Sequence, residues 1–124
     1  MNYNDPEPPP YEIKARTFEF SRQVIRLYML LNEKPGVGKV LSTQLLRSAT
    51  SIGANLEEAQ AGQSKPDFIH KCSISLKEAR ETHYWLRLLE AEAIVAPQQI
   101  APLSRECNEL ISILTAITRS AKKG

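Results

Sequence analysis

The feature that most constrains the fold is an unbroken apolar stripe near the C-terminus. Between residues 97 and 121, apolar side chains alternate at spacings of three and four: Ile100, Leu103, Cys107, Leu110, Leu114, Ile117 and Ala121. Because an α-helix has about 3.6 residues per turn, this spacing places all of them on one helix face. The same alternation is typical of helices packed side by side in bundles. The stripe therefore predicts a helix over 97–121 that packs against other helices.

Clusters of proline and glycine divide the rest of the body into comparable stretches. The breakers are Pro35, Gly36 and Gly38, then Pro66, and then Pro97 and Pro102. Helical periodicity fills 13–32, 39–62 and 66–93, and no stretch shows the alternation of a strand. Ser64 is predicted to cap the third helix, because Pro66 and Asp67 suit a first turn. The sequence thus predicts an all-α protein, an antiparallel up-down-up-down four-helix bundle over 13–122.

Residues 1–12 differ in composition from the body. They contain Pro6, Pro8, Pro9 and Pro10 and have no lysine or arginine. Because proline fixes φ and lacks an N–H donor, we expect a disordered, proline-rich tail. The three acidic residues of this tail leave sixteen basic and eleven acidic residues on the body, a formal charge of +5. That balance weakly favours anionic partners.

No catalytic or metal-binding motif emerges from the reactive residues. The two histidines, His70 and His83, lack the paired Glu-x-x-His motifs of di-iron bundles. The two cysteines, Cys72 and Cys107, form no C-x-x-C pair and fall on core stripes, where cysteine behaves as a small apolar residue. The sequence therefore predicts no metal, no cofactor and no enzymatic activity.

Hydropathy indicates the compartment. No apolar run approaches the length of a membrane span, and the N-terminus has no apolar core of a signal peptide. We therefore expect a cytoplasmic protein with reduced thiols and no membrane partner.

The third helix has apolar residues on two opposite faces. Its core stripe occupies one side, and Ile74, Trp85 and Leu88 fall nearly opposite. One bundle covers one face, so the second predicts an interface with another subunit, for which tryptophan is a favoured anchor. The alternative is a central third helix whose back is covered by loops.

A basic stripe follows the third helix at the same spacing. It consists of His70, Ser73, Lys77, Arg80, Tyr84 and Arg87, and Arg22 and Arg26 of the first helix are expected to extend it. Basic side chains neutralise phosphates and tyrosine stacks on unpaired bases, so the stripe is a candidate site for RNA or DNA. The alternative is a solvated face balanced by neighbouring glutamates.

A polar row lies on the second helix. Arg47, Ser51, Asn55 and Glu58 share one sector beside the core stripe. Serine and asparagine lower helix propensity by some tenths of a kcal/mol, which favours a compensating network. Arg47 and Asn55 are expected to form hydrogen bonds across helices, with Glu78 or Glu81 of the third helix as a partner. The alternative is an exposed polar face.

Two motifs resemble a known family. They are Arg47-Ser-Ala-Thr-Ser-Ile-Gly-Ala-Asn-Leu-Glu-Glu-Ala59 and, after Asp67-Phe-Ile-His-Lys, the segment Ile74-Ser-Leu-Lys-Glu-Ala-Arg-Glu-Thr-His-Tyr-Trp-Leu-Arg-Leu-Leu89. Together they resemble the four-helix-bundle family of 23S ribosomal RNA intervening-sequence proteins. They are also similar to the accessory variability protein of diversity-generating retroelements. The resemblance spans roughly residues 15–89, and the fourth helix matches only in pattern.

The resemblance implies a small bundle that assembles into a ring, often a homopentamer, and its retroelement relatives bind nucleic acid and a reverse transcriptase. The family's marker positions, carried over to this sequence, are the residues of the polar rows: Arg47, Ser51, Asn55, Glu58, Glu78 and Glu81. We therefore expect a non-enzymatic homo-oligomer with RNA or DNA as the ligand of the basic stripe. The alternative is a structural ring that binds another protein and no nucleic acid.

Overall fold

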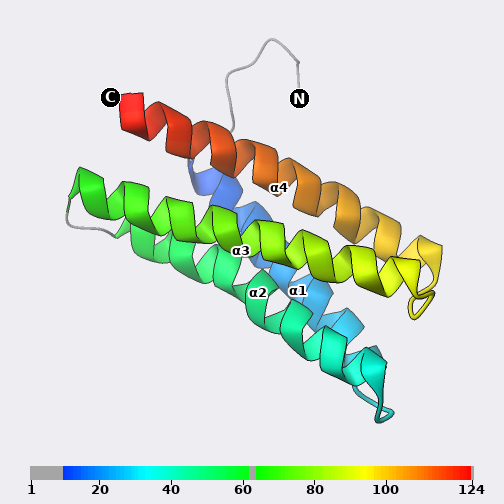
Figure 1. The fold of residues 1–124 in the computed structure, drawn as a ribbon. Helices are drawn as coiled ribbons and strands as arrows, with labels where there is room; N and C mark the ends of the chain where they lie inside the picture. Colours follow the sequence, from blue (N-terminus) through cyan, green and yellow to red (C-terminus); the bar gives the residue numbers. More distant parts are fainter. Residues whose placement is uncertain (1–9, 62–63, 124) are drawn as a thin grey trace.

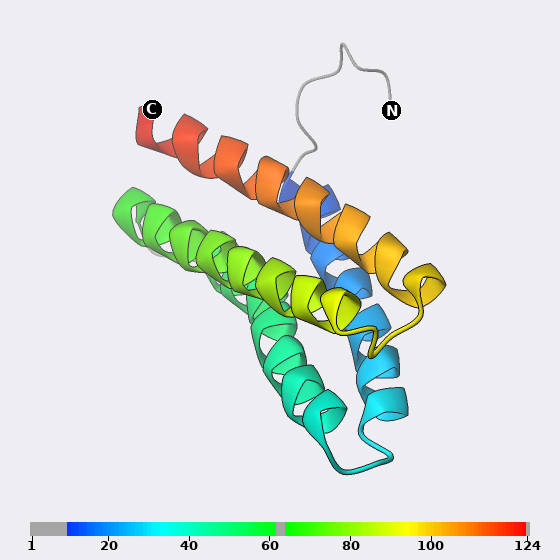
Figure 2. The ribbon, with the colours of Figure 1, turned by 45° about the vertical axis from the view of Figure 1, so that its right-hand side comes forward.

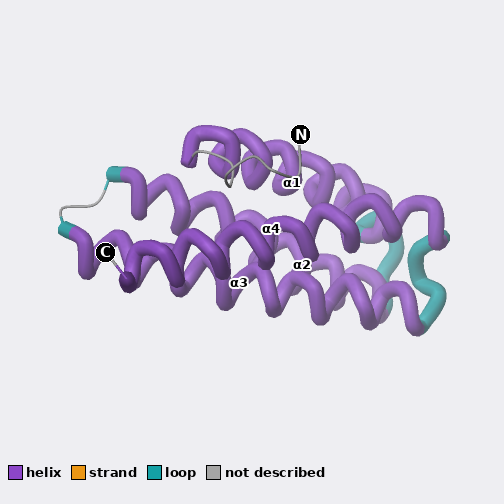
Figure 3. Tube along the Cα trace, turned by 90° about the horizontal axis from the view of Figure 1, so that it is seen from above, coloured by secondary structure: helices purple, strands orange, loops and turns teal. Residues whose placement is uncertain are grey.

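The computed structural model describes residues 10–61 and 64–123, which form four α-helices and no strand. The helices are α1 (Pro10–Leu31), α2 (Val37–Gln60), α3 (Lys65–Ala91) and α4 (Pro97–Lys123), shown in Figure 1. The turns after α1 and α3 lie at one end of the molecule, and the α2–α3 connection lies at the other (Figure 3). The predicted all-α class and the four helices are confirmed.

The start of α1 corrects the predicted boundary of the tail. The helix begins at Pro10, so residues 10–12 belong to α1, and the tail prediction for residues 1–9 lies outside the described residues. Proline is tolerated in a first helical turn because its missing N–H has no intrahelical partner there. Glu12 adds a negative charge in that turn, and a negative charge near the positive end of the helix dipole stabilises the helix.

The start of α3 was recognisable from the sequence, and its end was not. Ser64 caps the helix, and its Oγ accepts a hydrogen bond from the Asp67 backbone N–H at 3.3 Å, as predicted. At the other end Ala93 has φ 54°, while Ile94 N donates to Leu89 O and Ala93 N to Glu90 O, each at 3.0 Å. This Schellman arrangement normally uses glycine, so it could not be recognised from an alanine.

Replacing Ala93 with glycine is expected to raise the free energy of unfolding by about 1 kcal/mol. An alanine in the left-handed region is strained by roughly that amount, and glycine is not. Urea unfolding followed by circular dichroism measures the change. A matched Ala54→Gly substitution at an exposed position inside α2 should destabilise instead, by about 1 kcal/mol. Stabilisation by both variants would contradict the assignment of strain to Ala93.

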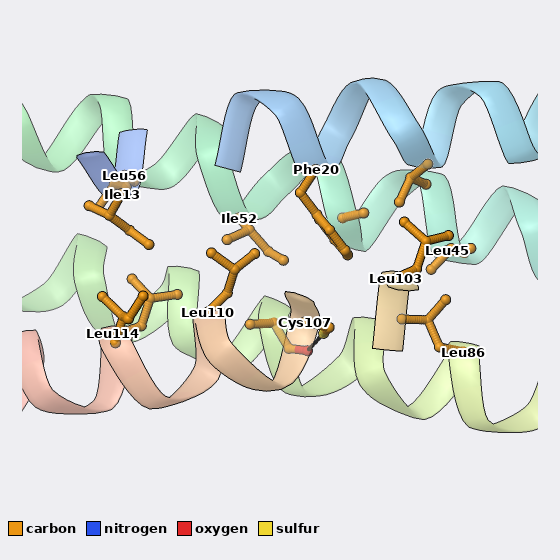
Figure 4. Packing of buried hydrophobic residues seen from close by; sticks show 14 of the residues in the cluster. Ile13, Phe20, Leu45, Ile52, Leu56, Leu86, Leu103, Cys107, Leu110 and Leu114 are labelled. Atoms are coloured by element: carbon orange, nitrogen blue, oxygen red, sulfur yellow. Dashed lines mark hydrogen bonds between the residues drawn. The ribbon is translucent and has the colours of Figure 1, made fainter. Parts of the chain in front are cut away.

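The core consists of layers contributed by all four helices (Figure 4). Phe20, Ile52, Cys107 and Leu110 form a central layer, and each is almost completely buried. The stripe predicted for α4 is buried at Ile100, Leu103, Cys107, Leu110 and Leu114. Helical spacing therefore identified the buried face of α4 correctly.

Hydroxyl groups let α2 and α3 pack closely. Ser75 Oγ donates to Ile52 O at 2.8 Å, and Thr82 Oγ1 lies 2.8 Å from Ser48 Oγ. All three hydroxyl residues are buried, so these bonds remove the penalty of burying polar atoms. The partner numbers on α3 fall as those on α2 rise, so the two helices run in opposite directions.

Of the neighbouring helix pairs, α1 and α4 make the least extensive contact. The two helices separate toward the end of α1 (Figure 2). Arg16 bridges them near the start of α1. Its Nε and Nη2 donate to the two Glu106 carboxylate oxygens at 3.0 and 2.6 Å, and Glu109 lies 3.3 Å from Nη2. The hydrogen bonds and negative charge of Glu106 raise the pKa of Arg16, which stays fully charged.

Candidate nucleic-acid interface

The basic stripe of α3 lies on the outside of the bundle. Lys77, Arg80, Tyr84 and Arg87 are all exposed, and none of the three cations forms an ion pair within the described residues. The Tyr84 side chain is 50% exposed. Its ring contacts that of Trp85 edge-on, with 5.3 Å between centroids and 68° between planes. The stripe therefore presents unbalanced positive charge beside an accessible aromatic ring.

α4 carries two further exposed cations that were not singled out from the sequence. Cys107 Sγ donates to Ala79 O at 3.4 Å, which aligns this part of α4 with Arg80. Arg105 and Arg119 are exposed on α4, also without an ion pair among the described residues. They stand fourteen residues apart, nearly four helical turns, and therefore share one side of α4. Arg105 stands about 200° around the helix from Cys107, which faces α3, so this side of α4 points outward and away from α3.

Arg22 and Arg26 do not extend this stripe, contrary to the prediction. They belong to α1, which packs on α2 and α4 and makes no contact with α3. Arg22 also pairs with Glu19 on its own helix at 3.0 Å. The prediction failed because one helix sequence does not reveal which helices lie beside it.

The polar row of α2 separates into two parts. Arg47 pairs with Glu78 of α3 at 3.3 Å and with Glu81. Ser51 Oγ instead donates to Arg47 O, and Asn55 Nδ2 donates to Ser51 O, each at 2.8 Å within α2. The expectation that Asn55 bonds across helices is wrong, because its amide finds a carbonyl one turn earlier. Glu58 forms an ion pair with Lys71 of α3, with 2.9 Å between Oε1 and Nζ.

We expect Arg47→Met to lower the free energy of unfolding by only about 1 kcal/mol. The Arg47 side chain is 48% exposed, so solvent screens its attraction to the two carboxylates. A double-mutant cycle with Glu81→Gln, measured by urea unfolding, gives the coupling free energy directly. A loss above 3 kcal/mol would show that the group behaves as a buried ion network.

The proposed interface residues on the back of α3 are partly covered by their own chain. Ile74, Trp85 and Leu88 are all half-buried, and Trp85 packs against the core. Its Nε1 donates to Glu81 Oε2 at 3.1 Å. The most exposed large apolar side chains lie elsewhere, on α1 and on the first turn of α2.

The reactive side chains do not assemble into a site. Among residues 10–61 and 64–123, no three His, Cys, Asp or Glu side chains are placed to hold a metal ion. His70 is exposed and His83 half-buried. Within the same residues, no helix is both long and apolar enough to span a bilayer.

Both thiols are expected to resist alkylation and disulfide exchange at pH 8 in the folded protein. Burial raises the pKa of Cys72 to about 11, and burial together with the Glu106 charge raises that of Cys107 to about 12. Ellman's reagent should therefore detect two thiols only after unfolding in urea. Because these pKa values exceed the usual 9.0, the thiols' contribution to stability should be lost as pH rises from about 9 toward 12. Rapid reaction of the native protein would contradict the buried placement.

Comparisons with known proteins agree with this architecture. The family model described as 23S rRNA-intervening sequence protein matches residues 10–116. A crystal structure of a protein of unknown function from the S23 ribosomal protein family of Bacteroides thetaiotaomicron is 38% identical, with a TM-score of 0.82. The match covers 89% of this chain and 97% of that one. No curated protein matches the chain. The chain therefore belongs to the 23S rRNA-intervening sequence protein family.

Proposed function

We propose that this protein is a non-catalytic homo-oligomer, an antiparallel four-helix subunit assembled into a ring, that binds RNA or DNA through the basic stripe of α3. The observation that carries the proposal is the exposure of Lys77, Arg80 and Arg87 without an acidic partner among the described residues. Unpaired surface cations gain most from phosphate, because binding releases the counterions condensed on the nucleic acid. Two unbridged cysteines fit a reducing cytoplasm.

The shape of the surface favours a single strand over a duplex. Tyr84 stands between Arg80 and Arg87 along the helix, and its ring is held against Trp85. An unpaired base can stack on such a ring while neighbouring phosphates contact the arginines, whereas the bases of a duplex are already stacked. The contacts involve phosphates and a ring face only, so binding should tolerate any sequence.

A ring would strengthen a weak surface by repetition. One strand that contacts several subunits binds the second and later copies intramolecularly, which raises avidity by about 10²–10⁴ without new contacts. The homopentamer suggested by the family resemblance would present five such surfaces. Affinity should therefore rise with the length of the strand.

Fluorescence anisotropy with labelled single-stranded RNA and DNA tests the proposal. Binding should weaken with salt, with a log–log slope of roughly −0.7 for each phosphate contact. A duplex of the same length should bind more weakly if Tyr84 stacks on bases. Absence of binding by either strand at about 25 mM salt would overturn the proposed nucleic-acid function.

A ring that binds another protein and no nucleic acid is the second candidate. The apolar hollow between α1 and α4, lined by Leu27, Leu30, Pro102 and Leu103, favours it because exposed apolar surface usually marks an interaction site. The two candidates differ in the anisotropy experiment, since only the first predicts salt-dependent binding.

A further inference from the structure

The outer face of α1 is the most apolar exposed surface of the subunit. Phe18, Ile25 and Met29 are 66%, 41% and 63% exposed. Their spacings of seven and four place them on one side of the helix, away from the core side marked by Phe20 and Val24. We call these three residues the α1 face. Isolated exposed apolar residues are common, but three large ones on one side of a helix, here with Arg22 between Phe18 and Ile25, mark an interaction surface.

A second apolar surface lies where α2 begins and α3 ends. Val37 and Val40 are 64% and 62% exposed on α2. Arg47 pairs with Glu81, and moving seven residues along each antiparallel helix places Val40 level with Leu88. Trp85 lies one turn earlier on α3 and is half-buried. We call Val37, Val40, Trp85 and Leu88 the α2–α3 face.

The two faces are separate surfaces of one subunit. α1 contacts α2 and α4 but makes no contact with α3, so α1 and α3 occupy opposite corners of the bundle. Side chains that point outward from these corners cannot meet within one subunit. Two different faces on different sides suit a head-to-tail contact, which closes into a ring when the rotation between copies allows it.

The charges beside the α1 face and beside the α2–α3 face have opposite signs. Beside the α1 face lie Arg22, Arg26 and Glu19, a local excess of one positive charge. Beside the α2–α3 face lie Glu78, Glu81 and Arg47, a local excess of one negative charge. Like-charged faces would repel, so two copies of the α1 face are a poorer match than one of each.

We propose that the α1 face of one copy packs on the α2–α3 face of the next copy. This inference rests on the self-association in the proposed function and names the surfaces that form it. It extends the interface expected at Trp85 and Leu88 onto α2 and supplies its partner. It also leaves Lys77, Arg80 and Arg87 outside the contact, available to nucleic acid.

Light scattering after size-exclusion chromatography tests the contact with one substitution on each face. Phe18→Glu and Val40→Glu each place a charge at an exposed position, and each should reduce the oligomer to the monomer mass of 13.9 kDa. Ser120→Glu, which makes a comparable change at an exposed site on α4, should leave the mass unchanged. Circular dichroism checks that each variant is helical, and Phe18→Gln or Val40→Gln replaces any variant that is not.

Mixing the two variants distinguishes a head-to-tail contact from a symmetric one. Phe18→Glu retains an intact α2–α3 face and Val40→Glu an intact α1 face, so the mixture should form one contact and a 1:1 dimer. A mixture that stays monomeric would overturn the head-to-tail pairing. An oligomer that survives both substitutions would overturn the choice of faces alone. A monomeric natural protein would overturn the proposed assembly itself.

Discussion

Replacing both Lys77 and Arg80 with glutamate is expected to weaken binding of single-stranded RNA or DNA by roughly a hundredfold at low salt, about tenfold for each reversed charge. Each substitution removes an attraction to phosphate and adds a repulsion. Both side chains are exposed and unpaired among the described residues, so the fold should be unaffected. Anisotropy titrations measure the affinity, and light scattering checks that the oligomer is intact.

A matched variant separates a local surface from overall charge. Lys122→Glu with Lys123→Glu changes the net charge equally, at exposed positions in the last turn of α4. If the site is the basic stripe of α3, the affinity of this variant for single-stranded RNA or DNA should fall less than about threefold, because charges beyond a Debye length are screened. Equal losses in the two double variants would indicate nonspecific attraction and contradict the assigned interface.

Replacing Phe20 with alanine is expected to lower the free energy of unfolding by about 3–5 kcal/mol. Phe20 is only 1% exposed and lies in the central layer of the core with Ile52 and Leu110 (Figure 4). Removing its ring forfeits the burial of apolar surface and leaves a cavity that a close-packed layer fills poorly. Urea unfolding followed by circular dichroism measures the loss.

Phe18 provides the control for this measurement, since it is a phenylalanine of the same helix turned outward. Phe18→Ala should change the stability of the subunit by less than about 0.5 kcal/mol. Both substitutions are best compared in the Val40→Glu background, because association would otherwise add to the apparent stability. A similar loss at both positions would contradict the orientation of α1.

The sequence by itself determined the four helices and the buried side of α4. The stripe of α4 is the clearest case, because Ile100, Cys107 and Leu114 follow the period of an α-helix and are completely buried. Prolines and glycines marked the turns because they act locally, through φ and the missing N–H. The helix bounds differed by only a few residues, most informatively at Pro10 and Ala93.

Only the tertiary structure decided which outward faces lie next to one another. Periodicity placed Arg22 and Arg26 on α1 and the basic stripe on α3 equally well, yet α1 packs on α2 and α4 and not on α3, so the two sets of cations do not form one surface. It also predicted two apolar faces on α3 without showing that Trp85 is half covered by its own chain while Phe18 stays exposed. The physical reason is that the spacing of residues depends on one helix alone. The neighbours of a face depend on how four helices cross, and no single stretch of sequence carries that information.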